Sequence, residues 1–249
     1  MVLGALQGPA ELLPVSSSAH LALVSRLLGW SYPSLAPGDR KFFDVALHAG
    51  SAPALAVAAL REPLPPMPML ALTALPAALM GLALEGPIER QLGGPRSVAL
   101  AQVAAGAALM AADRVGGDRG APGVADHLAV GVAQAAALVP GVSRLGAALT
   151  AARVRGLSRA ESARLALQAA LPVTAGAVAL KAARAARGEI AADMRAPAAA
   201  GAAAALASAL ASLSATRALA GERSWAVLGG YRMLFGAVSL ATRRLDGWP

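Results

Sequence analysis

The chain has 249 residues, of which 57% are hydrophobic and 14% charged, and its mean hydropathy is +0.57. A soluble domain carries about one quarter charged residues, so this composition excludes an ordinary soluble globule. The formal net charge of +8 comes mainly from arginines scattered between apolar runs. Arginines in such positions would contact lipid headgroups or fix the membrane topology. Their scatter argues against nucleic acid as a partner. The absence of cysteine excludes disulfides, thiolate metal sites and a cysteine nucleophile.

The N-terminal segment combines polar and ionisable residues with an apolar background. It carries Gln7, Glu11, three serines at 16–18, and His20, and it lacks the basic start of a signal peptide, so we expect it to stay in the mature protein. Pro9 marks a helix start or break nearby, Pro14 should break the helix again, and Ser16 can cap a new one, which predicts helix, break, helix. The alternative is a plain cap, with His20 at the interface and Glu11 paired to a distant arginine. Intramembrane carboxylates and imidazoles are costly, which favours a functional site.

Apolar runs without charge recur along the chain, at 45–60, 63–84, 97–112, 128–143, 165–180 and 196–216. Spanning a bilayer takes about 20 residues, so several runs must use their charged flanks or only dip into the membrane. The polar connections are brief, at 31–40, 85–96, 113–126, 188–195 and 221–224. None could hold a soluble domain, so we expect one integral membrane domain over residues 1–249.

A second cluster follows at Pro140, Gly141, Ser143 and Arg144. Gly141 would let backbone amides approach an anion, Ser143 would cap the next helix, and Arg144 would add a planar fork suited to phosphate. The alternative is an ordinary turn and cap, with Arg144 reaching the membrane interface. The relation of this cluster to the first favours the anion site.

That relation is a weak internal repeat. Gly4, Gln7, Pro14 and Ser17 recur as Gly131, Gln134, Pro140 and Ser143, and residues 46–53 resemble 166–172. Chance could produce such matches in an alanine-rich sequence. The alternative is a duplicated fold, which would explain the match of the polar clusters and that of the segments after them. The prediction is an all-α polytopic membrane protein with inverted repeats, in halves of approximately 1–120 and 121–249. Two re-entrant helical hairpins are expected, near 4–26 and 126–155.

Other polar residues are less decisive. His48 could line the cavity or be structural, and Asp44 could cap a helix. His127, at a loop edge, is expected to be solvated. Arg232 either reaches the interface or contributes to the cavity.

The ordered motifs resemble the undecaprenyl-diphosphate phosphatase family, known for bacitracin resistance. The family's (E/Q)xxxE motif is similar to residues 7–11, its PVSSxxH stretch to 14–20, its Phe-(Asp/Glu)-Val element to 43–45, and its PGxSRSxxT motif to 140–148. The chain departs from these patterns at Ala19, Leu145 and Ala148, where the family has Gly, Ser and Thr. The lost hydroxyls suggest a paralogue with an altered lipid-diphosphate substrate as one alternative.

The resemblance implies an enzyme that hydrolyses undecaprenyl diphosphate to the monophosphate and inorganic phosphate, recycling the carrier lipid for cell-wall synthesis. It also implies a multi-pass protein of the plasma (inner) membrane with its site facing the outer side. The partners would be a polyprenyl diphosphate and membrane lipids, with a homodimer left open.

For the chemistry, Arg144 would clamp the phosphates, and Glu11 with Gln7 would hold a divalent cation, Mg²⁺ or Ca²⁺. Ser16, Gly141 and Ser143 are expected to help bind the substrate.

The nucleophile stays open. Ser17 could attack with His20 as its base, His20 could attack itself, or Glu11 could activate water. A polyprenyl-phosphate flippase is the competing class, because broken inverted repeats also serve transport. A shared site requires Arg144 to lie within about 10 Å of Glu11 or His20.

Overall fold

The computed structural model describes residues 1–185, 192–219, 221 and 224–242, and this part of the chain contains helices and no β-strand. The α-helices are α1 (Val2–Leu12), α2 (Ser17–Ala19), α3 (Ser25–Leu27), α4 (Pro37–Ala59), α5 (Met67–Leu92), α6 (Pro95–Val115), α7 (Val124–Ala136), α8 (Arg144–Val154), α9 (Arg159–Ala185), α10 (Arg195–Ala211), α11 (Leu213–Leu219) and α12 (Ala226–Ala241). A π-helical turn, His20–Val24, joins α2 to α3, and short 3₁₀ turns lie at Tyr32–Ser34 and Ala192–Met194. The predicted all-α class is confirmed.

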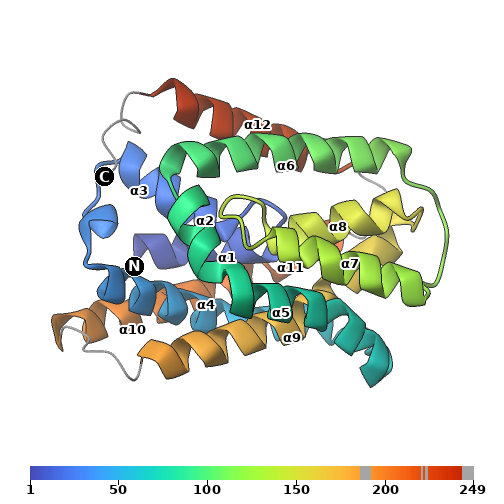
Figure 1. Cartoon of the computed structure of the whole chain (residues 1–249), viewed down its shortest axis with the longest axis horizontal. Coiled ribbons are helices and arrows are strands. Elements are labelled where there is room, and N and C mark those ends of the chain that lie inside the picture. Colours follow the sequence, from blue (N-terminus) through green and yellow to red (C-terminus); the bar gives the residue numbers. More distant parts are fainter. Residues whose placement is uncertain (186–191, 220, 222–223, 243–249) are drawn as a thin grey trace.

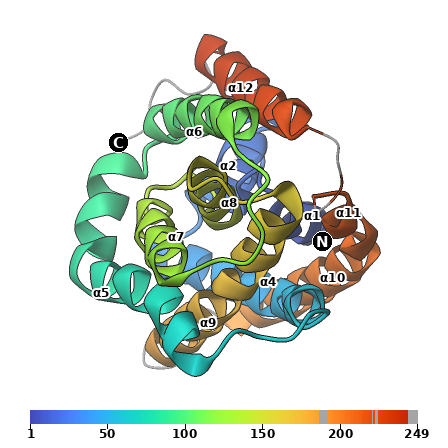
Figure 2. The ribbon, with the colours of Figure 1, turned by 90° about the vertical axis from the view of Figure 1, so that its right-hand side faces the viewer.

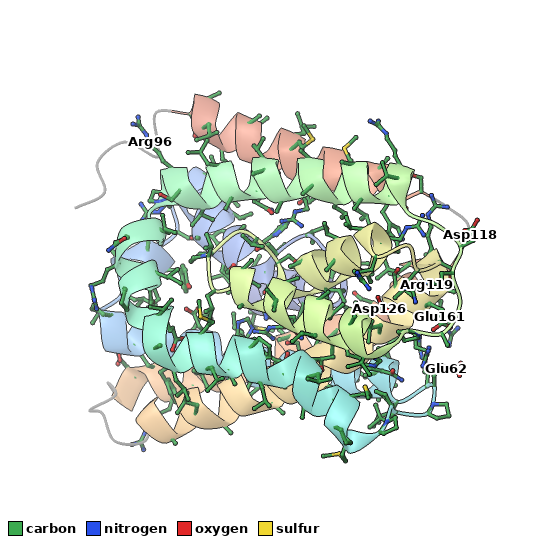
Figure 3. The ribbon with its side chains drawn as sticks, turned by 45° about the vertical axis from the view of Figure 1, so that its right-hand side comes forward. Glu62, Arg96, Asp118, Arg119, Asp126 and Glu161 are labelled. Carbon is green, nitrogen blue, oxygen red and sulfur yellow. The ribbon has the colours of Figure 1, made fainter. Side chains whose placement is uncertain are left out.

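Four of the described helices, α4, α5, α6 and α9, are long and apolar enough to cross a membrane, and the bent pair α10 and α11 could be a fifth span. Large apolar side chains on α5 point outward, with Leu79 and Leu82 both 64% exposed. Labelled charged residues lie instead at the two ends of the molecule, with Glu62 and Asp118 at one end and Arg96 at the other (Figure 3). Such a distribution suits a polytopic membrane protein.

The broken helices form a core inside a ring. Seen end-on, α1, α7 and α8 lie at the centre, while α4, α5, α6, α9, α10 and α12 surround them (Figure 2). The α1 hairpin and the α7–α8 hairpin extend from opposite ends of the molecule and meet in the middle (Figure 1). The fold therefore places both broken turns deep among the long helices, where a bilayer tolerates irregular backbone.

The two turns have the same local structure. Ser16 and Ser143 precede α2 and α8 with φ of 73° and 67°, and they are the non-glycine residues with positive φ in the described part of the chain. Each hydroxyl accepts a backbone N–H three residues later, at 3.4 Å from Ala19 and 3.1 Å from Gly146. The predicted reversals at Pro14 and Pro140 are confirmed.

The register of the repeat differs from the sequence match. Ser16, not Ser17, occupies the place of Ser143, so Ser17 and Arg144 are the first residues of equivalent helices. The two copies of the polar motif thus present a hydroxyl and a guanidinium at matching positions. This difference arises because the cap, which fixes the turn, was hidden within three consecutive serines.

Contacts between the hairpins and the ring follow the same pattern twice. Helix α1 packs against α10 and α4, and α7 packs against α5 and α9, while α6 crosses α12. Close approach depends on glycines, since a Cβ on Gly4 would lie 2.2 Å from the Gly201 carbonyl oxygen, and one on Gly131 would lie 2.2 Å from that of Leu72. The order of elements and contacts in α1–α6 thus reappears in α7–α12.

Some predicted breaks are wrong. Helix α1 continues through Pro9, because its packing on α10 outweighs the one backbone hydrogen bond that proline removes. The connections expected at 85–96 and 113–126 are partly helical, since α5 runs to Leu92 and α6 to Val115. A formed helix gains one hydrogen bond for each added residue, so it extends past the apolar run into its charged flank. The connections expected at 188–195 and 221–224 lie partly outside the described residues.

Candidate functional site

The candidate site lies where the two hairpins meet the long helices α4 and α9. Glu11 stands on the last turn of α1, Ser17 begins α2, and Arg144 begins α8. His48 comes from α4 and Thr174 from α9. Residues from four well-separated segments therefore converge, as the shared-site prediction requires.

Glu11 is the centre of the polar contacts. The Ser17 hydroxyl donates a hydrogen bond to Glu11 Oε2 at 2.7 Å, and the Gln7 amide donates to the same oxygen at 3.3 Å. Gln7 also donates to His48 Nδ1, which lies 3.7 Å from Glu11 Oε2. The carboxylate is therefore aimed at the serine and held from two sides.

Arg144 approaches the other oxygen of this carboxylate. Its Nη1 lies 3.9 Å from Glu11 Oε1 and donates a hydrogen bond to the Thr174 hydroxyl. The distance is well inside the limit of about 10 Å set for a shared site, so the prediction that the two clusters face each other is confirmed.

A pocket opens beside these groups, between α4 and α9. Its polar lining consists of His48, Arg144 and Thr174, and its apolar lining of Val45, Ala177 and Val178. Polar and apolar walls side by side suit an amphiphile with an anionic head and a hydrocarbon chain. The Arg144 guanidinium is the group in this lining able to bind two phosphate oxygens at once.

His20 lies apart from this hydrogen-bonded group. It is 6% exposed, its Nδ1 donates to the Ser16 carbonyl at 2.8 Å, and its Nε2 accepts from the Tyr231 hydroxyl at 2.6 Å. The ring also stacks on Phe235, with centroids 4.9 Å apart. Both ring nitrogens are thus engaged away from Ser17, and the hydroxyl of Ser17 is bonded to Glu11 instead.

The remaining expected substrate ligands hold the turns. Ser16 and Ser143 act as caps, and the N–H of Gly141 donates to the Ser18 hydroxyl of the other hairpin at 3.3 Å. Gly141 adopts φ of +103°, which favours glycine over any residue with a side chain. In this arrangement Gly141 links the two hairpins.

Both departures from the family pattern in the second motif, Leu145 and Ala148, are buried in the largest apolar cluster. Neither residue is among those that line the pocket.

The prediction of a solvated His127 is wrong. His127 is 3% exposed, and its Nδ1 pairs with the Gly123 carbonyl at 2.9 Å, whereas the loop edge suggested a solvated ring. The first turn of α7 lies against the neighbouring helices, which its sequence position alone did not indicate.

The first cluster offers ligands that fit a cation. Gln7 Oε1 is a buried oxygen without a hydrogen-bond partner, and Gln7 lies on the same face of α1 as Glu11. Because Nε2 of this amide now faces the Glu11 carboxylate, the amide must turn over for Oε1 and the carboxylate to bind one cation. Within the described ranges no group of three or more His, Asp or Glu gathers to form a complete metal site. A carboxylate and an amide oxygen nevertheless match the way Mg²⁺ is commonly held, by few protein ligands together with substrate phosphates.

Sequence reasoning left some contributors open or missed them. His48 was undecided and now contacts Gln7 and Glu11. Thr174 was not considered, and one hydroxyl in a long apolar run was the available signal. Arg232 is expected either at the interface or in the cavity, but it is fully buried and bonded to backbone carbonyls. Gln102 carried no prediction, although it too is a polar residue inside an apolar helix.

Fold and site together define a class: a polytopic membrane protein with a site for a phosphate-bearing lipid between two broken hairpins. The chain belongs to the family described as bacitracin resistance protein BacA, whose model matches residues 1–238. It is 40% identical to an undecaprenyl-diphosphatase of Geobacter sulfurreducens, over 79% of each chain. It is also 36% identical to an undecaprenyl-diphosphatase of Gemmatimonas aurantiaca, over 97% of this chain and 96% of the relative. The resemblance inferred from the motifs is confirmed.

Proposed function

We propose that the protein hydrolyses undecaprenyl diphosphate to undecaprenyl phosphate and inorganic phosphate. The observation that carries this proposal is the hydrogen bond from the Ser17 hydroxyl to the Glu11 carboxylate. The Arg144 guanidinium lies 3.9 Å from the other oxygen of that carboxylate. A hydroxyl, a base and a phosphate-binding cation in one amphipathic pocket are the parts that phosphoryl transfer needs.

Ser17 is the nucleophile in this proposal and Glu11 its base. The Ser17 Oγ attacks the terminal phosphorus, its proton passes to Glu11 Oε2, and the bridging P–O bond breaks to release undecaprenyl phosphate. Water then attacks the phosphoserine, the P–Oγ bond breaks, and Glu11 returns the proton to Oγ. The 2.7 Å hydrogen bond supports Glu11 in this role over His20, whose ring nitrogens are engaged elsewhere.

Arg144 binds the oxygens of the transferred phosphoryl group, and its bond to Thr174 orients the guanidinium. Gln7 donates both to the carboxylate of Glu11 and to His48 Nδ1, and so keeps these two side chains next to each other. The apolar wall of Val45, Ala177 and Val178 takes the first part of the isoprenoid chain. The pocket thus separates the head of the lipid from its tail.

Gln7 and Glu11 are the proposed ligands of a divalent cation, Mg²⁺ or Ca²⁺. When bound there, the cation would supply positive charge to the phosphate oxygens. The unpartnered Gln7 Oε1 supports this assignment.

The proposed location is the plasma membrane, with the site open to the outer side, where the product can re-enter carrier-lipid recycling for cell-wall synthesis. A second copy of the chain as partner remains a prediction. The competing flippase function has no observation in its favour, because translocation needs phosphate-binding groups but not the paired hydroxyl and carboxylate.

The direct test is phosphate release from undecaprenyl diphosphate by the purified protein in detergent. We expect turnover of inorganic phosphate with a matching amount of undecaprenyl phosphate, and loss of both in Ser17→Ala. Lipid transport in vesicles without phosphate release would overturn the proposal in favour of the flippase.

Chelation tests the proposed cation. Removing divalent cations should abolish most phosphate release, and adding Mg²⁺ or Ca²⁺ should restore it, because charge neutralisation is the main demand of phosphoryl transfer. Gln7→Ala should raise the cation concentration needed for half-maximal rate while changing the maximal rate less. Full activity in chelator would remove the cation from the mechanism, and an unchanged cation response in Gln7→Ala would remove Gln7 as a ligand.

A further inference from the structure

Arg232 has a fully buried side chain that reaches from α12 to the turns of both hairpins. It stands on α12, is 0% exposed, and donates four hydrogen bonds. Nη1 donates to the Pro14 carbonyl at 3.0 Å, and Nη2 donates to the carbonyls of Gly141 at 2.9 Å and Val142 at 2.7 Å. One guanidinium therefore holds the turns of both hairpins.

Gln102 completes this arrangement from α6. Its side chain is also 0% exposed, and its oxygen accepts the fourth hydrogen bond, from Arg232 Nε at 3.0 Å. Its amide nitrogen donates to the Val15 carbonyl at 2.8 Å. Gln102 and Arg232 are together called the turn clamp. They connect α6 and α12 to two neighbouring carbonyls in each turn, those of Pro14 and Val15 in one and those of Gly141 and Val142 in the other.

The two members of the turn clamp occupy equivalent positions. Helices α6 and α12 cross at glycines, where Gly106 meets the Gly229 carbonyl and Gly236 meets the Ala99 carbonyl. Gln102 precedes Gly106 by four residues, and Arg232 precedes Gly236 by four. The turn clamp thus lies where the two matching helices cross, next to the two matching turns.

The turns explain why a buried cation stands here. A helix that breaks inside a bilayer leaves carbonyl groups without partners, and each costs free energy unless a donor reaches it. Arginine offers five N–H donors in one planar group, more than any other side chain. Among the described residues no carboxylate forms an ion pair with Arg232, so backbone carbonyls and the Gln102 oxygen balance its charge.

The held carbonyls directly precede the reactive residues. Pro14 and Val15 come just before Ser17, and Val142 comes two residues before Arg144. The distance between the hydroxyl and the phosphate-binding guanidinium thus depends on how far apart the two turns lie. The bond from the Gly141 N–H to the Ser18 hydroxyl also links the two hairpins directly.

We propose that Arg232, with Gln102, is a positioning residue for diphosphate hydrolysis: it fixes the two re-entrant turns against each other and so sets the place of Ser17 and Glu11 relative to Arg144. This inference rests on the proposed function for its kinetic consequences. Its structural consequence, a fixed relation between the hairpins, is independent of catalysis.

The kinetic test compares Arg232→Lys, Arg232→Met, Gln102→Leu and Gln102→Glu in the full-length protein. Lys cannot reach carbonyls of both turns at once, so both Arg232 variants should lower kcat about a hundredfold, while KM changes less than about threefold. Gln102→Leu should lower kcat less, and Gln102→Glu, which keeps the acceptor for Arg232 and loses the donor to Val15, should lie between Leu and wild type.

Arg153 supplies the matched control. It is 3% exposed and also donates to backbone carbonyls, those of Asp113, Gly116, Gly117 and Leu157, but it touches neither turn. Arg153→Lys should lower thermal stability and leave the kcat of the folded protein nearly unchanged. If the loss of activity came only from a general loss of packing, Arg153→Lys and Arg232→Lys would lower kcat to a similar extent.

A distance measurement gives the readout that does not depend on turnover. The chain has no cysteine, so cysteines placed at Leu28 and Val154, which are 57% and 64% exposed and lie at the outer ends of the two hairpins, can carry spin labels. The wild-type distance distribution should be narrow, and Arg232→Met should broaden or shift it, while Arg153→Lys should not.

Each outcome decides the proposal. Wild-type kcat in Arg232→Met, or a lowered kcat with an unchanged distance distribution, would overturn it. If the Arg232 variants do not fold, the two Gln102 variants decide by the same measurements. If wild-type protein shows no hydrolysis, the proposed function fails, and the distance arm still tests whether the turn clamp holds the hairpins.

Discussion

Replacing Glu11 with glutamine is expected to lower kcat for undecaprenyl diphosphate hydrolysis by about a hundredfold or more. Glutamine keeps the shape of the side chain and can still accept a hydrogen bond from Ser17. It cannot take the Ser17 proton, and it removes the negative charge that faces Arg144 and the proposed cation. The measurement is phosphate release at saturating lipid and cation.

The matched control is Glu62→Gln, at an exposed carboxylate at one end of the molecule (Figure 3). It should leave the rate unchanged. His20→Ala distinguishes the two candidate bases: it should cost clearly less than Glu11→Gln, because the His20 ring is bonded to Ser16 and Tyr231. A Glu11→Gln enzyme with near wild-type turnover, or an inactive His20→Ala enzyme beside an active Glu11→Gln enzyme, would return the role of base to His20.

The hairpins could be predicted because their signals are local. Proline at 14 and 140 disfavours a continuing helix, and a serine two or three residues later can cap the next one, so each break is contained in a few residues. The end of a long helix is a weaker signal. Helix α5 extends to Leu92, past the end of the apolar run at 84, because each residue added to a formed helix gains a backbone hydrogen bond.

The site could be predicted as far as its ionisable members. Glu11 and Arg144 stand out because charged groups are costly in an apolar segment, and they do come together, with the Ser17 hydroxyl bonded to Glu11. The direction of a side chain was not predictable. Ser17 and His20 are three residues apart, which in an α-helix would place them on one face. The π-helical turn that begins at His20 alters this spacing. The imidazole stacks instead on the aromatic rings of α12.

Gln102 and Arg232 show a further limit. Their partners are backbone carbonyls, which every residue has. No pattern of side chains in the sequence therefore predicts the role of Gln102 and Arg232. The one available signal was the presence of an amide and a guanidinium inside apolar helices, which burial makes costly without partners.

Replacing Arg144 with alanine is expected to lower kcat/KM by about a hundredfold or more, and lysine should fail to restore it. Arg144 is the guanidinium that lines the pocket, held by Thr174 and facing Glu11. Lysine keeps the charge but offers a point contact, whereas the planar fork can bind two phosphate oxygens together. The measurement is phosphate release across a range of lipid concentrations.

Two controls make the Arg144 result specific to phosphate binding. Arg114→Ala removes an equal charge from an exposed position at the end of α6 and should leave kcat/KM unchanged. Thr174→Val removes the hydroxyl that orients Arg144 while keeping the size of the side chain, so it should give a smaller loss in the same direction. If Arg144→Lys matches wild type while Arg144→Ala is inactive, charge alone suffices and two-oxygen binding is wrong. If Arg144→Ala itself turns over normally, another group must hold the phosphate.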